Sequence, residues 1–287
     1  MNQNAQSRST GRPSQADDSR QTTMKTTISV IIPALNEAAC IARAIQAAWV
    51  AGADEVIVVD GQSQDTTPEI ARLHGATVLS SPAGRAIQQN SGAAMARGNV
   101  LLFMHGDNWL DPDAGRQIRA CLDDPKTLGG AFQQHIEAPG RLYRLLEWGN
   151  AARVRWRGMA YGDQAIFMRR ETFERLNHFS PVKLMEDVLL MRSFRKLAQP
   201  VLLPGPVHVH PRRWQQHGVI IQTLRNWSLR LAHAAGFSPD QLAHFYPVHK
   251  VPAHGEIAHD VERTASGEWQ EPVASGEWQV ENYLPRP

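Results

Sequence analysis

Apolar residues in the first part of the chain fall into short runs separated by amphipathic segments. The runs are rich in β-branched residues and almost wholly apolar, which is typical of strands covered on both faces of a sheet. The predicted strands are Ile28–Ile32, Glu55–Val59, Ala76–Leu79 and Asn99–Met104. The predicted helices are Ala38–Ala51, a helix that starts at Thr67-Pro68, and Ala86–Ala96. Strands that alternate with helices indicate an α/β fold with a parallel sheet and right-handed crossovers.

The second half of the chain has a less regular pattern. Its predicted strands are Gly129–Glu137, Ala165–Met168 and the extended segment Val201–Val209. Its predicted helices are Leu142–Asn150, Arg170–Leu176, Met185–Leu197 and Ile220–Ala235. We therefore expect the folded part of the chain to run from residue 27 to about residue 246.

The two ends of the chain do not follow either pattern. Residues 1–26 are rich in Gln, Ser, Thr and Asp and contain no apolar segment, so we interpret them as a disordered extension and not as a secretion signal. Residues 247–287 contain a duplicated segment, Ala265–Gln270 and Ala274–Gln279, which is too short to form a solenoid. We predict that this part is a flexible tail, and its two tryptophans leave a partner-binding segment as the alternative.

Composition narrows the function classes. The net charge of +2 gives no reason to expect a nucleic-acid partner, and the 42% apolar residues suffice for a sizeable core. The two cysteines, Cys40 and Cys121, are far apart and have no metal-like spacing, which favours a reducing, cytoplasmic setting. No run approaches the roughly 20 apolar residues that span a bilayer, so a transmembrane segment is not predicted.

Polar side chains follow the predicted parallel strands at the point where each strand ends. Ligands of such sheets bind beyond the carboxyl ends of the strands, so these residues are candidates for one binding site. They are Asn36, Glu37, Asp60, Asp65, His105 and Asp107.

Three acidic motifs have specific chemistry. Asp60 to Asp65 can accept hydrogen bonds from a nucleobase or ribose, or can form a turn and cap the next helix. His105-Gly-Asp107 can hold Mg²⁺ or Mn²⁺ between phosphates, or can be a plain turn. Glu186-Asp187 can supply a general base for an acceptor hydroxyl, or can cap a helix start, where acidic side chains are favoured by the helix dipole.

The motifs together resemble a known family. In order and spacing they are similar to those of the family 2 inverting glycosyltransferases, over roughly Thr27 to Tyr246. The motifs are Ile31–Glu37, Val58–Asp65, Asp107 and Glu186-Asp187. A narrower set resembles the bacterial subgroup linked to arsenosugar biosynthesis. This set is Gly84-Arg85 with Gln88 and Asn90, Tyr161–Phe167, Leu184–Asp187 and Arg212-Arg213-Trp214.

The resemblance implies a glycosyltransferase A fold, a Rossmann-like mixed sheet flanked by helices, for the catalytic domain 27–246. It implies a nucleoside-diphosphate sugar as donor, Mn²⁺ or Mg²⁺ as cofactor, and catalysis by Asp187 with Glu186 beside it. Asp60 would bind the base or ribose, and Arg85 would approach the phosphates. The residues implied for the donor site are Pro33, Asn36, Glu37, Asp60, Asp65, Arg85, Asn90, Arg212, Arg213 and Trp214.

The metal site implied by the resemblance is incomplete. Asp107 corresponds to the second carboxylate of the family's Asp-X-Asp motif, but His105 occupies the position of the first. His105 is therefore either a ligand or a neighbour of one, and the late histidines His208 and His210 are further candidate ligands, since an i, i+2 pair on a strand shares one face. Two alternatives to a glycosyltransferase stay open. One is a nucleotidyltransferase that makes NDP-sugars, and the other is a degenerate nucleotide-binding module, which the missing carboxylate suggests.

Arg141 to Arg157 carries five arginines among three aromatic residues. Such a stretch can contact anionic lipid or a phosphorylated acceptor, or can simply be a solvated helix face. Peripheral contact at the inner face of the membrane is therefore a hypothesis, and a membrane-embedded processive synthase is not expected.

Overall fold

One eight-stranded mixed sheet, in the order β3-β2-β1-β4-β7-β6-β8-β5, runs through the part of the chain that the structure describes. The structure, a computed structural model, describes residues 25–243, apart from the side chains of residues 213, 217 and 234. The strands are β1 (Ile28–Ala34), β2 (Glu55–Asp60), β3 (Thr77–Ser80), β4 (Val100–Phe103), β5 (Asn108–Leu110), β6 (Gly129–Ile136), β7 (Ile166–Arg169) and β8 (Val201–Val209).

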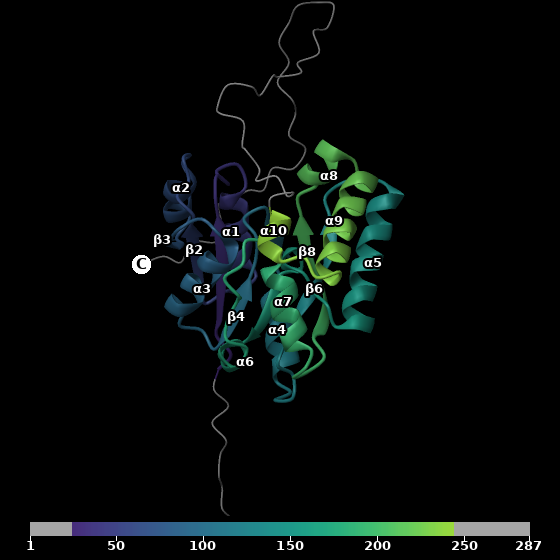
Figure 1. Cartoon of the computed structure of the whole chain (residues 1–287). Helices are drawn as coiled ribbons and strands as arrows, with labels where there is room; N and C mark the ends of the chain where they lie inside the picture. Colours follow the sequence, from purple (N-terminus) through teal and green to yellow (C-terminus); the bar gives the residue numbers. More distant parts are fainter. Residues whose placement is uncertain (1–24, 244–287) are drawn as a thin grey trace, which may run out of the picture. The chain divides into compact units, whose positions relative to one another are not determined.

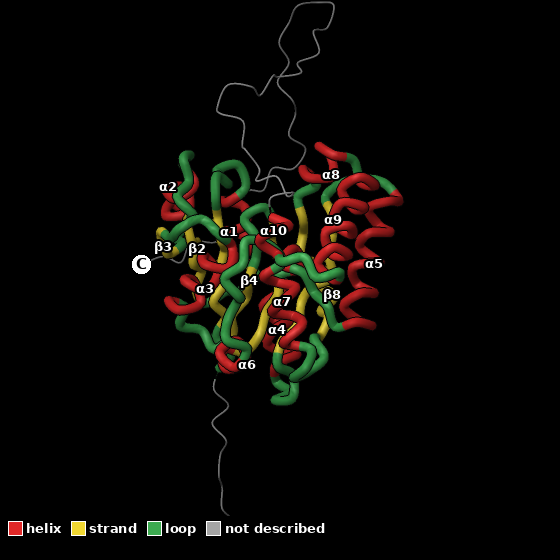
Figure 2. The backbone as a smooth tube through the Cα atoms, viewed as in Figure 1, coloured by secondary structure: helices red, strands yellow, loops and turns green. Residues whose placement is uncertain are grey.

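Helices cover both faces of the sheet (Figure 1), and the tube view shows the strands enclosed between them (Figure 2). The helices are α1 (Ile41–Val50), α2 (Thr67–Leu73), α3 (Arg85–Met95), α4 (Ala114–Leu122), α5 (Arg141–Arg157), the 3₁₀ turn η1 (Gly162–Gln164), α6 (Arg170–Arg175), α7 (Glu186–Phe194), α8 (Arg212–His217), α9 (Val219–Ala234) and α10 (Pro239–Ala243).

The first four predicted strands form the parallel half of the sheet, as expected. β1 lies between β2 and β4, and β2 also pairs with β3, all in parallel. Their carboxyl ends therefore meet at one edge, which brings the loops after β1, β2 and β4 together.

The remaining strands make the sheet mixed. β7 pairs antiparallel with β4 and β6, and β6 pairs parallel with β8. The short strand β5, which follows the Asp107 loop, pairs antiparallel with β8, so that Asn108 lies opposite Val209. The fold class is confirmed: this is an α/β fold with a mixed sheet flanked by helices, in which chain segments from both halves meet at the ligand edge of the sheet.

Two hydrophobic clusters lie on opposite faces of the sheet, because successive strand residues point to opposite sides. One contains Ile28, Val30 and Ile32 of β1 and is covered by α1 and α4. The other contains Ile31 of β1 and is covered by α3, α5, α6 and α7, together with Leu229 of α9. Because both sets of residues are buried, both faces of these strands are covered, as the sequence pattern predicts.

A buried polar bridge joins the starts of β1 and β2. The Ser29 hydroxyl donates to Glu55 Oε2 at 2.7 Å and accepts the N–H of Gly98 at 2.9 Å. Arg97 adds a backbone N–H bond to the same carboxylate at 2.8 Å. The bridge thus ties two strands to the end of the helix that precedes β4.

The predicted extension 1–26 and tail 247–287 fall almost wholly outside the described residues, and the domain bounds 27–246 stay a prediction. Within 25–243, no helix combines the length and the apolar character needed to cross a bilayer.

Candidate active site

The loops after β1 and β2 are held by one another. Asn36, at a left-handed φ of 54°, accepts the N–H of Gln64 at 2.7 Å. Asp60 accepts the N–H groups of Gln62 and Ser63, both at 3.1 Å. Asp65 accepts the N–H groups of Thr67 at 3.0 Å and Ala38 at 3.2 Å. These predicted donor-site residues therefore fix the shape of the sheet edge with their side chains.

Two residues of α3 act over long sequence separations. Gln88 donates from Nε2 to the carbonyl oxygens of Ala34 and Val59, both at 2.8 Å, and so joins the tips of β1 and β2. The Asn90 amide donates to the carbonyl of Phe179 at 2.9 Å and accepts its N–H at 3.0 Å. Asn90, predicted for the donor site, thus holds the loop before α7.

A cation from the end of the domain closes over the strand tips. Arg212 Nη2 lies 2.7 Å and 2.9 Å from the two carboxylate oxygens of Glu37 and 2.9 Å from Asp107 Oδ2. Burial lowers the pKa of Arg212, but the hydrogen bond to Glu37 and the charge of Asp107 raise it more, so its pKa lies above the usual value. Three predicted site residues, 175 positions apart at the extremes, are thus in direct contact.

At the start of α7, Glu186 is buried and Asp187 is half-buried. Glu186 is 3% exposed and its Oε1 lies 3.8 Å from the Arg85 guanidinium. Asp187 accepts the N–H of Gly162 at 2.6 Å and of Val188 at 2.7 Å. Burial raises the pKa of Asp187, and these two N–H groups lower it in part. A half-buried carboxylate with a raised pKa has the properties of a general base.

Gly162 connects the acidic pair to His105. A Cβ atom at this position would lie 2.7 Å from His105 Nε2 and 3.5 Å from Asp187 Oδ2. The missing side chain therefore allows the imidazole and the carboxylate to approach the same point of the backbone. This close packing explains why a glycine stands between the predicted base and the end of β4.

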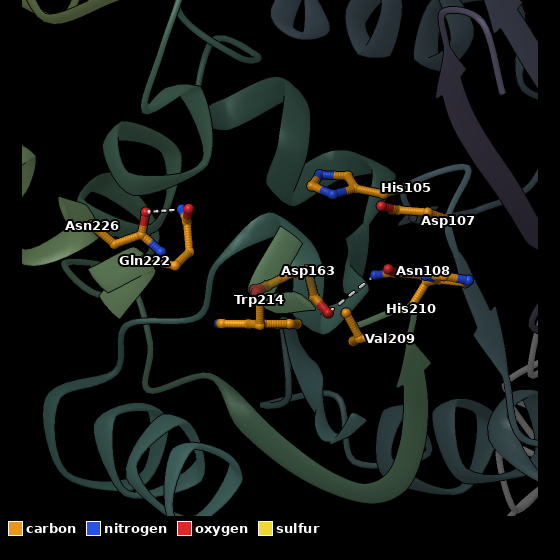
Figure 3. A pocket seen from close by; sticks show the side chains of 9 residues that line it. All are labelled: His105, Asp107, Asn108, Asp163, Val209, His210, Trp214, Gln222 and Asn226. Carbon is orange, nitrogen blue, oxygen red and sulfur yellow. Dashed lines mark hydrogen bonds between the residues drawn. The ribbon is translucent and has the colours of Figure 1, made fainter. Parts of the chain in front are cut away.

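A polar pocket opens beside this point (Figure 3). Its empty volume is about 420 Å³, part of it open to solvent. Figure 3 shows Asp163 between His105 and Asp107 on one side and Trp214 on the other. The pocket residues are His105, Asp107, Asn108, Asp163, Val209, His210, Trp214, Gln222 and Asn226.

Two oxygens of the pocket residues are buried acceptors. Asn108 Oδ1 and Asp163 Oδ1 have no hydrogen-bond partner among the described residues, although the Asn108 amide nitrogen donates to the carbonyl of Asp163 at 3.2 Å. Buried acceptors without partners favour a ligand that brings O–H or N–H donors.

The sequence motifs give no role to four of the polar pocket residues: Asn108, Asp163, Gln222 and Asn226. Asp163 lies within the motif Tyr161–Phe167, and Gln222 and Asn226 are an i, i+4 polar pair joined by a 3.0 Å hydrogen bond. A polar pair on a helix with many apolar residues is the sequence feature that could have indicated a role for Gln222 and Asn226.

The predicted late histidines lie in different surroundings. His210 lines the pocket, and its Nδ1 accepts the N–H of Arg212 at 3.2 Å. His208 Nδ1 lies 2.6 Å from Glu137 Oε1, and its ring stacks on Trp109 with centroids 5.6 Å apart. The geometry thus groups His210, and not His208, with Asp107.

The residues near Asp107 do not assemble a metal-ligand set as they stand. Within residues 25–243, no three His, Cys, Asp or Glu side chains converge as ligands would. The cation beside Asp107 is Arg212, whereas a divalent ion in such a site needs several oxygen ligands. The ligand roles of Asp107, His105, His210 and His208 stay predictions.

Comparison with known proteins agrees with this architecture. The family model described as glycosyl transferase family 2 matches residues 29–184, more than half of the chain. The matched region contains β1 to β7, with the Asp60, Asp107 and Gly162 segments. No curated protein matches the chain.

The solved structures that match the chain include one protein of S. aureus and one of Mycobacterium tuberculosis. TarS 1–349 of S. aureus has a TM-score of 0.51 at 18% identity, covering 64% of this chain and 61% of that one. The same protein in complex with UDP-GlcNAc gives 0.50 at 19%, covering 64% and 58%. Glucosyl-3-phosphoglycerate synthase of Mycobacterium tuberculosis gives 0.46 at 24%, covering 64% and 70%. The chain therefore spans about 61% of the length of TarS 1–349.

Proposed function

The chain belongs to glycosyl transferase family 2, and from this premise we propose that it transfers a sugar from a nucleoside diphosphate to an acceptor, with inversion at the anomeric carbon. The observation that carries the proposal is the half-buried Asp187 carboxylate, which lies together with the pocket residue His105 at the Cβ position that Gly162 leaves free. A base beside a pocket at the carboxyl end of a parallel sheet is the arrangement that acceptor activation requires.

Asp187 is the proposed general base. It takes the proton of the acceptor hydroxyl as the oxygen attacks the anomeric carbon from the side opposite the diphosphate. The new C–O bond forms as the bond to the diphosphate breaks, so the electron pair leaves with the phosphate oxygen. The N–H groups of Gly162 and Val188 hold the carboxylate in place.

Two arginines are placed to stabilise the charge on the leaving diphosphate. Arg85 and Arg212 both retain partial exposure, at 38% and 27% of their side chains. Each is paired with carboxylates, Arg85 with the buried Glu186 and Arg212 with the half-buried Glu37 and the buried Asp107, and so is held at the sheet edge before a donor arrives. Fixed cations near a departing phosphate favour the transition state because little reorganisation is needed.

The pocket suits an uncharged, hydroxyl-rich group. Asn108 Oδ1 and Asp163 Oδ1 accept hydrogen bonds, and the Trp214 ring offers an apolar face to a sugar ring. A phosphate at the same place would meet two acceptors and gain no donor from them. This supports seating a sugar ring, of donor or acceptor, beside Asp187.

A divalent metal at Asp107 and the narrower assignment to the arsenosugar-linked subgroup both stay predictions from the sequence. Mn²⁺ or Mg²⁺ would supply charge neutralisation at the diphosphate, and Asp107 with His105 or His210 would be the residues to hold it.

A thermal-shift panel tests the donor site. The protein is heated with UDP, GDP, CDP or ADP, each with and without Mn²⁺. We expect one diphosphate to raise the melting temperature, because a ligand that binds only the folded state stabilises it by mass action. The shift should be lost in Asp107→Ala if metal is required. A flat panel for all four would favour a degenerate binding module.

Substitution Asp187→Asn tests the base. We expect turnover of the donor identified in the panel to fall about 10²- to 10⁴-fold, the usual contribution of general base catalysis. The diphosphate-induced thermal shift should be kept. Asp123→Asn, at an exposed position just after α4, is the matched control and should keep full turnover. Near-normal turnover of Asp187→Asn would remove the base assignment.

A further inference from the structure

A row of large apolar side chains on α9 faces solvent. Ile220, Leu224, Trp227 and Leu231 are between 62% and 72% exposed, and Ile221 beside them is 67% exposed. The spacing of four, three and four residues places the row on one face of the helix. Contiguous apolar surface of this kind marks an interaction site.

Helix α5 carries a second exposed set of apolar side chains. Trp148 and Trp156 are 61% and 76% exposed, and their rings meet edge to face with centroids 6.2 Å apart. Leu142 and Leu145 add further exposed apolar surface on the same helix. Exposed arginines alternate with these residues: Arg141, Arg144, Arg155 and Arg157.

The two helices are joined through one tyrosine. Arg153 of α5 lies over the Tyr161 ring at 3.5 Å, and Arg230 of α9 donates to its hydroxyl at 2.7 Å. Figure 1 shows α5 and α9 on the same flank of the sheet. Their exposed residues therefore belong to one region of the domain, which we term the α5–α9 surface: the exposed apolar residues and arginines of the two helices.

The charge of this region is predominantly positive. No Asp or Glu occurs between Asp187 and Asp240, and α5 contains five arginines against the single Glu147. The cations between the two aspartates are Arg192, Arg195, Lys196, Arg212, Arg213, Arg225 and Arg230. A second copy of the chain docked by a two-fold axis would bring like charges together, which disfavours a symmetric dimer here.

We propose that the α5–α9 surface docks on an anionic lipid bilayer. Trp and Leu side chains with interleaved arginines are the chemistry of interfacial helices, which bury the apolar residues at the acyl boundary and place cations at the phosphates. Gln222 and Asn226 of the same helix α9 line the pocket, so docking holds the pocket next to the bilayer. This inference does not depend on the reaction that the pocket serves.

Vesicle co-sedimentation of the full chain tests the proposal. The probes are vesicles of phosphatidylcholine alone and of phosphatidylcholine with phosphatidylglycerol. We expect binding to the anionic vesicles only, weakened by added salt because surface charges are screened. Equal binding to both kinds of vesicle, or to neither, would overturn the proposal.

Surface variants locate the contact. The double variant Leu224→Ser, Trp227→Ser should lower partitioning onto anionic vesicles at least about tenfold, since both side chains are solvent-exposed and contribute by burial in lipid. Leu73→Ser, at an 82% exposed position on α2, is the matched control and should bind like the unchanged protein. Melting temperatures should agree for all three.

Charge variants test the arginines. Arg155→Glu with Arg157→Glu should lower partitioning by roughly fivefold or more for each position. Arg72→Glu on α2 is the control, and a similar loss there would show that only net charge matters and would overturn the surface. A concentration-dependent dimer that disappears in the Leu224→Ser, Trp227→Ser protein, without any vesicle binding, would assign the face to a second copy instead.

Discussion

Glu186 gives a prediction whose size follows from its surroundings. The side chain is 3% exposed at the start of α7, with the Arg85 guanidinium 3.8 Å away and Asp187 next to it. Burial raises the pKa of Glu186 from 4.5 to about 7; Arg85 lowers it in part and the charge of Asp187 raises it. The folded protein therefore holds a proton on Glu186 that the unfolded chain has already released.

The sign of the pH dependence follows from this difference. Below pH 4.5 Glu186 is protonated in both the folded and the unfolded protein, so it does not lower the free energy of unfolding. As the pH rises from 4.5 to about 7 the unfolded state binds fewer protons than the native state, so stability falls. Above that window the full destabilisation by Glu186 is present, and the rise of its pKa from 4.5 to about 7 corresponds to a loss of roughly 3 kcal/mol in the free energy of unfolding.

Glu186→Gln removes the ionisable group and keeps the shape of the side chain. We expect the variant to be more stable than the unchanged protein by roughly 3 kcal/mol at pH 8, which for a domain of this size raises the melting temperature by roughly 6 to 12 °C. Near pH 4.5 the two proteins should melt together. Calorimetry at both pH values measures the difference.

The exposed Glu69→Gln is the matched control and should shift neither melting temperature. If Glu186→Gln gave the same change at both pH values, the cause would be packing and not ionisation. If Glu186→Gln melted at a lower temperature than the unchanged protein at pH 8, the ionised Glu186 carboxylate would stabilise the fold through Arg85. Its burial would then not be destabilising.

Two further substitutions test other parts of the account. Gly162→Ala places a methyl group 2.7 Å from His105 Nε2, so the ring must move; we expect turnover to fall about 100-fold with little change in melting temperature. Gly149→Ala, whose Cβ would meet nothing within 4 Å, should leave turnover unchanged. Ser29→Ala removes a buried hydrogen bond to Glu55, and denaturant unfolding should show a loss of about 1 to 3 kcal/mol; no loss would mean that the bridge is dispensable.

The parallel half of the sheet was predictable because its signal is local. Each of β1, β2 and β4 is a continuous apolar run that becomes buried on both faces, and the helices between them show their own periodicity. β5 was not predicted, because its three residues become a strand only by pairing with β8, about a hundred positions away. Pairing at that distance leaves no mark in a short window of sequence.

Site residues could be predicted where a motif follows the end of a strand. Their contacts with residues far away in the sequence could not. Glu37 and Asp107 were expected near one another, but the contact of both with Arg212 depends on how the chain returns after β8. Asn90, predicted for the donor site, contacts the backbone of Phe179, 89 positions away. Chemical type is readable in sequence; the partner of a polar group is set by tertiary structure.

The two late histidines show how a correct rule can fail at a boundary. An i, i+2 pair shares one face only while both residues remain in the strand. β8 ends at Val209, so His208 keeps its strand position against Trp109 while His210 turns into the pocket. The residue at which a strand ends is the part of a prediction from sequence that is least reliable.

The most direct test of the central claim is product analysis after incubation with UDP-, GDP-, CDP- and ADP-sugars, with Mn²⁺ present and absent, and with free sugars offered as acceptors. We expect release of one nucleoside diphosphate together with transfer of the sugar, and loss of both in Asp187→Asn. Pyrophosphate chemistry in place of diphosphate release, or no turnover of any donor that binds, would contradict the assignment of a sugar transferase.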